Sequence, residues 1–234
     1  MFASSRKDRV AGIGIYKAPP NLSKEALETK ITSLVDALLA VPIAQKNFLK
    51  FEIIYQNEFL NPHLKALGFP EAPASVWLRL ECETDAHGAE ILTDPALVKV
   101  YAEAEEFLPY VMAFMADVVT KIDLPTPRNR MHIMCTFQCP VHLSSNEYRT
   151  KFEGFVDRLL ALPITQKSIL KYSVWMPNNT LDAPLRDLGF PQLEPVFVVM
   201  AETENQECMI EWLTHPDFKD YVVDARRDLG VHIG

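Results

Sequence analysis

The sequence predicts an α+β protein made of two tandem units, each with strands and helices in the order βαββαβ. The chain of 234 residues is long enough for two cores of roughly 100 to 115 residues each. Sliding the chain against itself by 121 residues aligns residues 10–108 with 131–229 without a gap, with about thirty identical residues in 99 positions. In both copies, short runs with apolar residues at every second position alternate with amphipathic runs whose apolar residues recur with helical periodicity.

The strongest match between the copies spans the end of the first long helix and the strand after it. It reads LLAVPIAQKNFLKF at residues 38–51 and LLALPITQKSILKY at residues 159–172, and LGFP follows in both copies. One fold used twice is the economical explanation. The predicted division is a first repeat at residues 1–124, a linker at 125–130 and a second repeat at 131–234.

Each repeat begins with a strand and a capped helix. Ser23 and Ser144 offer a side-chain oxygen at the N-terminus of an amphipathic run. Pro42 and Pro163 stop that run and fit the first position of a one-turn helix. The first strands are expected at residues 12–17 and 132–138.

The rest of each repeat adds two strands and a divided helix. Runs rich in aromatic and branched residues predict the second strand, and a short helix after it ends at a glycine suited to left-handed backbone. Apolar residues at every second position predict the third strand, and Pro95 and Pro216 divide the second long helix. The second strands are expected at residues 49–56 and 170–176, the short helices at 63–67 and 184–188, and the third strands at 76–83 and 196–204.

Only the first repeat contains a candidate for a fourth strand, residues 111–122, so the second repeat is expected to lack its last strand. Since the fourth strand of such a unit flanks the first, residues 132–138 should form an open sheet edge, which a second copy in a homodimer could cover. The order of elements predicts antiparallel sheets with both helices on one face. We expect the two sheets to face each other as a pseudo-twofold α+β barrel within one chain.

Charge and composition argue against several classes of function. The formal net charge of −8 and the isoelectric point near 5.3 disfavour nucleic-acid and membrane partners. The chain begins without the apolar core of a secretory signal, so a cytoplasmic location is expected. The four cysteines have neither paired CxxC spacing nor the density of a disulfide framework. Because nucleotide-binding and metalloprotease motifs are also missing, we expect no metal and no cofactor.

The motifs at the helix ends resemble those of the dimeric α+β barrel superfamily. They are the A-V-P and A-L-P turns after the first helix and the T-D-P and T-H-P interruptions of the second. Within that superfamily the chain is most similar to the EthD-like and stress-responsive A/B-barrel proteins, as a tandem form of fungal type. The resemblance covers nearly the whole chain.

This resemblance implies a ferredoxin-like fold for each repeat and an apolar cavity for small aromatic or polyketide-like molecules. Members of the superfamily include cyclases, decarboxylases and monooxygenases that work without a metal, and fold alone does not fix which chemistry a member performs. One motif departs from the pattern. Many EthD-like members carry His-Gly-Pro in the first helix, whereas the helices here read KITSLVDALLAVP and KFEGFVDRLLALP, so chemistry at that histidine is not implied.

Alternation along the third strand predicts which side chains line the barrel. Trp77, Arg79 and Glu81 share the face opposite the helices, beside Glu52 on the neighbouring strand. A glutamate in apolar surroundings has a raised pKa and suits general acid–base chemistry, so Glu81 is a catalytic candidate, with Arg79 to orient an oxyanion. The alternative is an ion pair of Arg79 with Glu81 or Glu52 that only stabilises the barrel mouth.

The second repeat presents a different set on the equivalent face. Ser173 and Trp175 stand where the first repeat has Glu52 and Ile54, while Glu202 is retained. We predict that these side chains bind substrate in one cavity together with the first repeat's aromatic and charged residues. A single functional site should therefore be asymmetric.

Three further residues are candidates for the site. His132 opens a strand and could transfer protons near neutral pH, or could be a strand-end histidine of no chemical role, and its side of the sheet is left open. Tyr16 and Phe137 occupy equivalent strand positions and could wall a substrate pocket or pack in the core.

These observations lead to three hypotheses of function. The first is a cofactor-independent lyase, cyclase or isomerase that acts on a small apolar or aromatic metabolite, in a cavity between sheet and helices or between the two sheets. The second is a non-catalytic small-molecule-binding or stress-response barrel. The third is a cofactor-free monooxygenase with a similar pocket.

Overall fold

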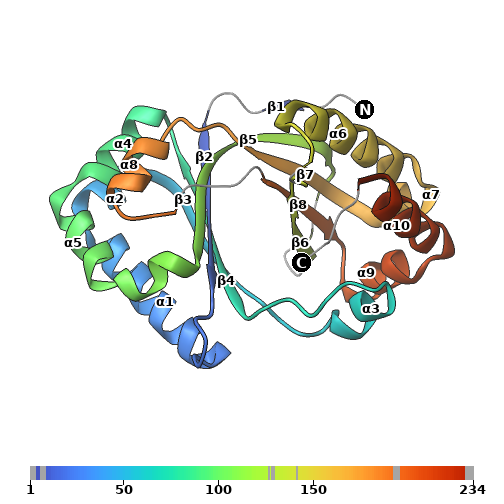
Figure 1. Ribbon diagram of the computed structural model, residues 1–234, viewed down its shortest axis with the longest axis horizontal. Helices are drawn as coiled ribbons and strands as arrows, with labels where there is room; N and C mark the ends of the chain where they lie inside the picture. The colour runs from blue at the N-terminus through green and yellow to red at the C-terminus, as the bar shows by residue number, and fades with distance from the viewer. Residues whose placement is uncertain are drawn as a thin grey trace.

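A computed structural model describes residues 4–5, 9–125, 127, 130–140, 142–191 and 196–229. One eight-stranded antiparallel sheet runs through the molecule in the order β3–β4–β2–β5–β7–β8–β6, with β1 paired to β5 (Figure 1). Part of the predicted linker and the last residues of the predicted second repeat, 230–234, lie outside the described residues. The strands are β1 Ser4–Ser5, β2 Val10–Lys17, β3 Phe48–Tyr55, β4 Ser75–Cys82, β5 Val111–Asp123, β6 Met131–Gln138, β7 Ile169–Pro177 and β8 Val196–Thr203.

The helices follow the predicted order in both halves. From β2 to α4, each element begins 121 residues before a counterpart of the same type in the second half, as a tandem repeat predicts. The repeat itself, and the domain boundaries drawn from it, stay our inference from the sequence. The helices are α1 Lys24–Ala40, α2 Pro42–Asn47, α3 Asn61–Ala66, α4 Asp85–Thr93, α5 Pro95–Glu103, the 3-10 helix η1 Glu105–Tyr110, α6 Ser145–Ala161, α7 Pro163–Ser168, α8 Asp182–Asp187, α9 Gln206–Thr214 and α10 Pro216–Leu229.

Local signals set the helix ends as predicted. Ser23 Oγ accepts a hydrogen bond from the backbone N–H of Ala26, and Ser144 forms a reciprocal capping box with Glu147. Pro42 begins α2, where its missing N–H costs nothing. These contacts involve only neighbours in the chain, which is why the sequence alone predicts them.

Strand β5 joins the two halves into one sheet. The halves do not form two separate sheets packed face to face. β5 pairs with β2 along residues 111–116 and with β7 along residues 116–123. Ala116 is paired with both Ala11 of β2 and Pro177 of β7, so the two strands lie along opposite edges of β5, and β7 satisfies the backbone groups that face away from β2. The expectation of two facing sheets is therefore corrected to one continuous, curved sheet.

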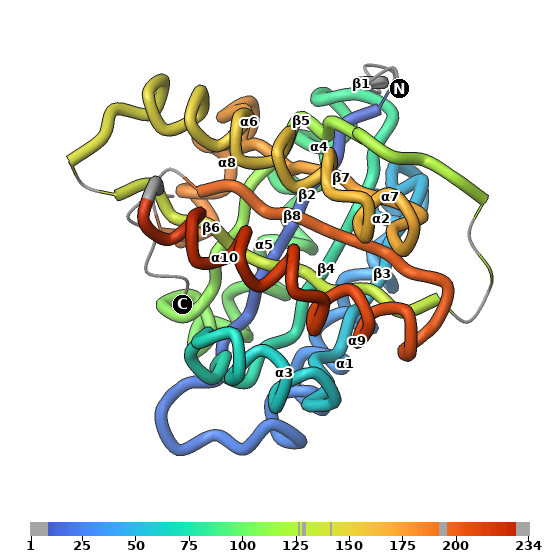
Figure 2. The backbone as a smooth tube through the Cα atoms, turned by 90° about the vertical axis from the view of Figure 1, so that its right-hand side faces the viewer, coloured from blue at the N-terminus to red at the C-terminus, as the bar shows by residue number. Residues whose placement is uncertain are grey.

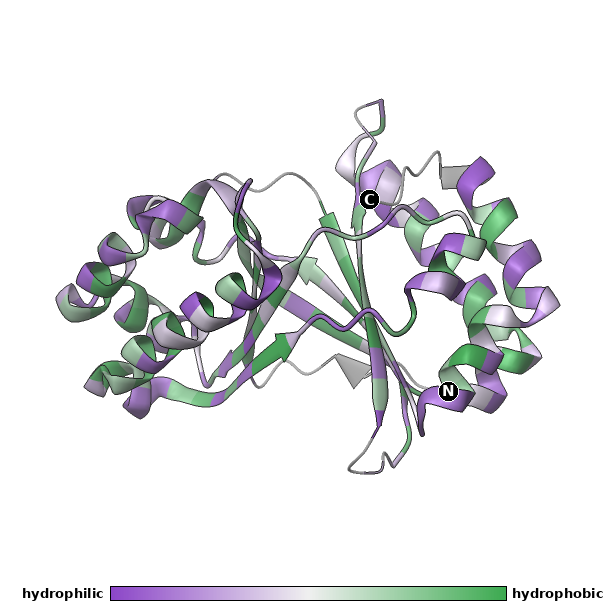
Figure 3. Ribbon diagram, turned by 90° about the horizontal axis from the view of Figure 1, so that it is seen from below, coloured by the Kyte–Doolittle hydropathy of each residue, from purple (hydrophilic) through white to green (hydrophobic). Residues whose placement is uncertain are grey.

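The curved sheet encloses an apolar inner cluster and carries its helices outside. Ile13, Phe114, Trp175 and Val198 belong to this cluster, so inner faces from both halves meet. Figure 3 shows the helices in two layers at opposite ends of the molecule, with the strands between them. The barrel is open, because β3 and β6 end the sheet and no described strand pairs with the outer edge of β6.

Two connections cross from one half to the other. The α3 arm, residues 56–74, places Leu60 and Leu67 in the core beneath α6, α9 and α10. The α8 arm, residues 178–191, places Leu185 and Phe190 in the core beneath α1, α4 and α5. Figure 1 shows α8 beside α4, and Figure 2 shows α3 beside α9. Each half therefore completes the other half's core.

No helix in the described part of the chain is long and apolar enough to cross a membrane.

Candidate functional site

The structure places most of the predicted site residues on the inner face of the sheet. In β4, Val76, Leu78 and Cys82 pack against the helices, whereas Trp77 packs with the inner cluster. The predicted alternation along this strand is confirmed. It brings Arg79 and Trp77 to the same side as the inner residues of β7 and β8.

Arg79 is 8% exposed and contacts both halves of the chain. It forms an ion pair with Glu52, its Nη1 lies 3.4 Å from Met200 Sδ, and its guanidinium carbon lies 5.9 Å from the centre of the Trp175 ring. Burial favours a higher pKa for Glu52, but hydrogen bonding and the charges of Lys50 and Arg79 outweigh it and lower that pKa. Glu52 is therefore a paired carboxylate rather than an acid, as the structural alternative predicts.

Glu81 has a different setting from the one predicted. Its Oε2 lies 3.1 Å from Arg9 Nη1, at the opposite end of β4 from Trp77. The expectation of a glutamate isolated in apolar surroundings is therefore wrong, because a cation from the segment before β2 reaches it. A catalytic role for Glu81 stays only a prediction.

His132 lies on the inner face, which resolves the side left open by the sequence. It is directly opposite Glu202 in the β6–β8 register, and Glu202 Oε2 lies 2.6 Å from Arg130 Nε. Burial lowers the pKa of His132 and outweighs the Glu202 carboxylate, which raises it. Ser173 is 1% exposed on the same face, with its Oγ 3.5 Å from Thr120 Oγ1.

Tyr16 and Phe137 lie on the other side of the sheet. Tyr16 packs beneath the helices of the first half, and Phe137 packs against Phe152 and Phe155 beneath those of the second. The two residues line separate pockets beneath the helices, outside the inner-face cavity predicted for the tryptophans and carboxylates. The sheet separates these two rings from the inner-face group.

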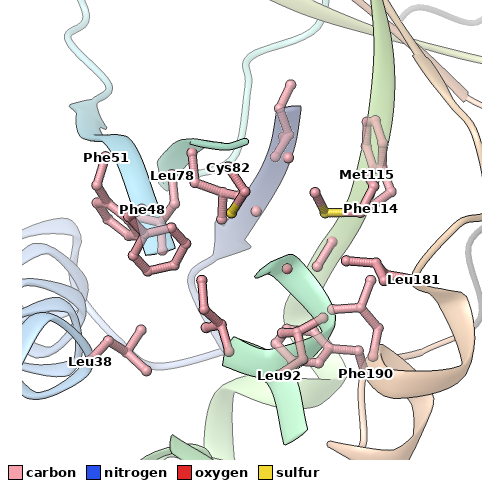
Figure 4. A pocket seen from close by; sticks show the side chains of 18 of the residues that line it. Leu38, Phe48, Phe51, Leu78, Cys82, Leu92, Phe114, Met115, Leu181 and Phe190 are labelled. Atoms are coloured by element: carbon pink, nitrogen blue, oxygen red, sulfur yellow. The ribbon is translucent and has the colours of Figure 1, made fainter. Parts of the chain in front are cut away.

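The pocket that contains Tyr16 lies between the sheet and α4, α5 and the α8 arm. Its cavity volume is about 60 Å³. Figure 4 shows apolar side chains converging on it from β3, β4, β5 and the α8 arm. The residues that form its walls include Leu38, Phe48, Phe51, Leu78, Leu80, Leu92, Leu97, Met115, Leu181, Leu185 and Phe190. We call it the phenol pocket, for the two tyrosines described below.

Two glycines of β2 leave room for the phenol pocket. Gly12 and Gly14 face the helices where the second half has Ile133 and Cys135. A Cβ at Gly12 would lie 2.9 Å from Leu80 Cδ1, closer than such atoms approach. Glycine in a strand often marks such a close approach.

The phenol pocket contains a pair of tyrosines, of which Tyr16 is buried and Tyr101 is half-buried. Burial raises the pKa of Tyr16 well above its ordinary value, and neighbouring Tyr101 raises it further. Burial raises the pKa of Tyr101 to about 12, although its hydrogen bond with Tyr16 acts in the other direction. Phe190 from the α8 arm meets Tyr101 edge to face at 5.2 Å between ring centres. Burial likewise raises the pKa of the Cys82 thiol to about 11.

The equivalent pocket of the second half lacks this pair. It has a volume of about 70 Å³, and Phe137 and Val222 stand at the positions of Tyr16 and Tyr101. Two other tyrosines line it, of which Tyr221 donates its hydroxyl hydrogen bond to the Phe155 carbonyl at 2.9 Å. The sequence prediction missed Tyr101, although its replacement by valine in the second copy was a signal.

The described residues hold no group of three or more His, Cys, Asp or Glu side chains placed to bind a metal ion.

No family model matches the sequence, and no curated protein matches it. Solved structures, in contrast, superpose on most of the chain. An anthrone oxidase-like protein superposes with a TM-score of 0.58 at 6% identity, over 97% of this chain and 89% of its own. A proposed monooxygenase from Fusobacterium nucleatum subsp. nucleatum gives 0.52 at 8% identity, over 97% and 88%.

The chain shares the fold of these proteins. At such low identity the likeness concerns the fold alone, and it confirms the α+β architecture that the sequence resemblance implied. Membership of the EthD-like or stress-responsive group, and of a fungal tandem form, stays a prediction.

Proposed function

We propose that this protein binds a small apolar or aromatic molecule in the phenol pocket and transforms it without a cofactor. The observation that carries the proposal is the pair of phenols, buried Tyr16 and half-buried Tyr101, in an otherwise apolar pocket. A largely apolar cavity with a few convergent polar groups is the usual form of a small-molecule site. The preferred substrate carries a carbonyl or phenolic oxygen that accepts hydrogen bonds from these two residues.

The raised pKa values determine what the two phenols do. Both stay protonated at neutral pH, so they act as hydrogen-bond donors and not as bases. Donors held in a site of low dielectric constant stabilise an oxyanion more strongly than water does. Decarboxylation of a β-keto acid forms such an oxyanion when CO2 leaves, whereas cyclisation and isomerisation of an enolisable compound form it when a water molecule in the pocket takes the α-proton. The first class of hypothesis, a lyase, cyclase or isomerase, is therefore our main proposal.

Substrate entry requires side chains to move. The cavity of about 60 Å³ is smaller than the roughly 150 Å³ that accommodates benzene in an engineered protein core. Met115 and Leu181 border the pocket, and methionine adapts its shape easily because its side chain is unbranched. We propose that these two side chains shift when an aromatic ring binds.

Two alternatives use the same pocket. A binding protein would hold the molecule without turnover, whereas a cofactor-free monooxygenase would also consume oxygen. The names of two structural neighbours, a proposed monooxygenase and an anthrone oxidase-like protein, favour including oxygen in the test.

The experiment uses anthrone as the probe, under air and under argon. We expect wild-type protein to bind and convert it, and Y16F/Y101F to lower the rate by on the order of a hundredfold, the usual loss when an oxyanion donor is removed. The control is Tyr110→Phe, which alters an exposed tyrosine outside the pocket and should leave the rate unchanged. Under argon the conversion open to anthrone is tautomerisation to anthrol, so anthrol formed there favours the isomerase class, whereas oxidation to anthraquinone, with O2 consumed and water released, favours the monooxygenase. Binding without turnover identifies a binding protein, whereas equal rates in wild type and Y16F/Y101F would contradict the role of the phenols.

A further inference from the structure

A second set of cavities lies at the open side of the barrel. Two adjoining cavities of about 130 and 140 Å³ share five lining residues, namely Leu64, Ala72, Trp77, Ile133 and Met134. They lie between the free edge of β6, the beginning of β4 and the α3 arm, and we call them the barrel-mouth groove. The groove shares no lining residue with the phenol pocket, so the two are separate sites.

Two buried hydrogen-bond donors lie behind the wall of this groove, since neither Arg79 nor Trp175 lines either cavity itself. Arg79 and Trp175 are 8% and 3% exposed, and neither Arg79 Nε nor Trp175 Nε1 has a hydrogen-bond partner among the described residues. The two side chains are in contact, since the guanidinium carbon lies 5.9 Å from the centre of the indole ring. A buried donor left without an acceptor destabilises the folded state, so each such group in a native protein calls for an explanation.

The strand register connects the groove to these donors. Trp77, which lines both cavities, is two residues before Arg79 on the same face of β4. Met134, which also lines both, is directly opposite Met200, whose sulfur contacts Arg79. The wall of the groove is therefore continuous with the surroundings of Arg79.

The charges beside the groove are already matched. Arg79 is paired with Glu52, and Arg130 lies 2.6 Å from Glu202. A bound carboxylate would be buried there without a cation of its own, whereas an uncharged oxygen needs only a hydrogen-bond donor. The aromatic and apolar walls formed by Trp77, Ile54 and Met134 suit a flat, apolar body.

We propose that the barrel-mouth groove binds an uncharged aromatic carbonyl compound, such as an aryl ketone. Its ring lies against Trp77, and its carbonyl oxygen accepts hydrogen bonds from both Trp175 Nε1 and Arg79 Nε. This site is independent of the function proposed for the phenol pocket, because the sheet separates the two.

The three tryptophans of the chain provide a direct test in the intact protein. Their indole N–H signals are resolved in ¹H–¹⁵N spectra during titration with acetophenone, benzoate and ethylbenzene. We expect acetophenone to shift the Trp175 signal in a saturable manner and to perturb Trp77. Trp212 serves as an internal control, since its Nε1 already donates to Thr165 Oγ1 at 3.0 Å in the core of the second half. Benzoate and ethylbenzene should bind about tenfold more weakly, because one adds a charge and the other lacks an acceptor.

Two variants examine the donors separately. Trp175→Phe keeps an aromatic ring without the N–H, and E52S/R79M places in β3 and β4 the residues that the second half has at the equivalent positions. Each should weaken acetophenone about fivefold to tenfold while leaving ethylbenzene unchanged, because only the carbonyl uses the donors. Y16F/Y101F should leave the acetophenone-induced shifts intact, which separates this site from the phenol pocket. The proposal is overturned if no saturable shift of Trp175 occurs, if benzoate binds as tightly as acetophenone, or if folded Trp175→Phe binds acetophenone like wild type.

Discussion

In the pockets beneath the helices, single side chains rather than the backbone distinguish the two halves of this molecule. The first strand of the first half has Gly14 and Tyr16 where the second half has Cys135 and Phe137. Both pairs occupy the helix-facing side of equivalent strands. The first half lacks a side chain at Gly14 and has an additional ring hydroxyl at Tyr16. These two differences give its pocket space and a hydrogen-bond donor, although the scaffold is shared.

At the residue scale, we predict that His132 makes stability depend on pH. Its pKa is lowered in the folded protein, whereas the unfolded chain has the ordinary value of about 6.5. As the pH falls through about 6.5, the unfolded state takes up a proton that the folded state does not, so stability falls until the lowered pKa is reached. In His132→Gln this part of the pH dependence should disappear. Urea unfolding between about pH 5 and 7.5 measures the effect, and His142→Gln, at an exposed turn, is the control. Equal slopes in the parent and His132→Gln would show that the buried histidine is not responsible.

At the scale of elements, the LGFP motifs act as docking segments. Gly68 and Gly189 adopt positive φ angles of 78° and 89°, which favour glycine. A Cβ at Gly189 would lie 3.0 Å from Leu108 Cδ1, which belongs to the other half. Next to Gly68, Phe69 lies 5.0 Å from the guanidinium of Arg226, again in the other half. The repeated motif therefore forms a contact between the halves as well as a local turn.

Glycine substitutions test this docking with opposite expected signs. Gly189→Ala should destabilise the protein by about 1–2 kcal/mol, because alanine is strained at positive φ and crowds Leu108. Gly154→Ala, in exposed α6 with no atom within 4 Å of the added Cβ, should stabilise it by about 0.5–1 kcal/mol. Chemical unfolding of both variants provides the comparison. A Gly189→Ala variant as stable as the parent would mean that the arm does not dock as described.

The other feature at the scale of elements is the open edge of strand β6. It pairs with β8 on one side, and no described strand pairs with its other side. Open edges invite pairing with another chain. A homodimer through this edge stays a prediction.

At the scale of the whole molecule, the halves depend on each other. The sheet is continuous through β5 and β7, and each arm fills part of the opposite core. Neither half has a complete core of its own. We infer that the molecule folds and unfolds as one cooperative unit.

A matched pair of leucines tests this cooperativity. Leu67 belongs to the first half but packs in the second half's core, and its counterpart Leu188 does the reverse, each 8% exposed. Leu67→Ala and Leu188→Ala should each destabilise the protein by about 2–5 kcal/mol. In calorimetry we expect one transition in the parent and in both variants, at a lower temperature in the variants. Two transitions, with each variant shifting only one, would contradict the single unit.

Much of the fold was predictable because it depends on neighbours in the chain. Caps at Ser23 and Ser144, prolines at helix starts and alternation along β4 each act within a few residues. The inner-face positions of Trp77, Arg79 and Ser173 followed from the same alternation. These positions did not require knowledge of the packing between halves.

The sequence by itself therefore determined the order of the elements and the faces of most strands. Only the tertiary structure decided that Arg9 neutralises Glu81, that His132 faces the barrel, and that Tyr16 meets Tyr101 beneath the other half's arm. The physical reason is the separation along the chain of the residues that interact. Periodicity and capping are local, whereas ion pairs, burial and pocket walls depend on residues far apart in the chain that meet only when the sheet curves and the arms cross.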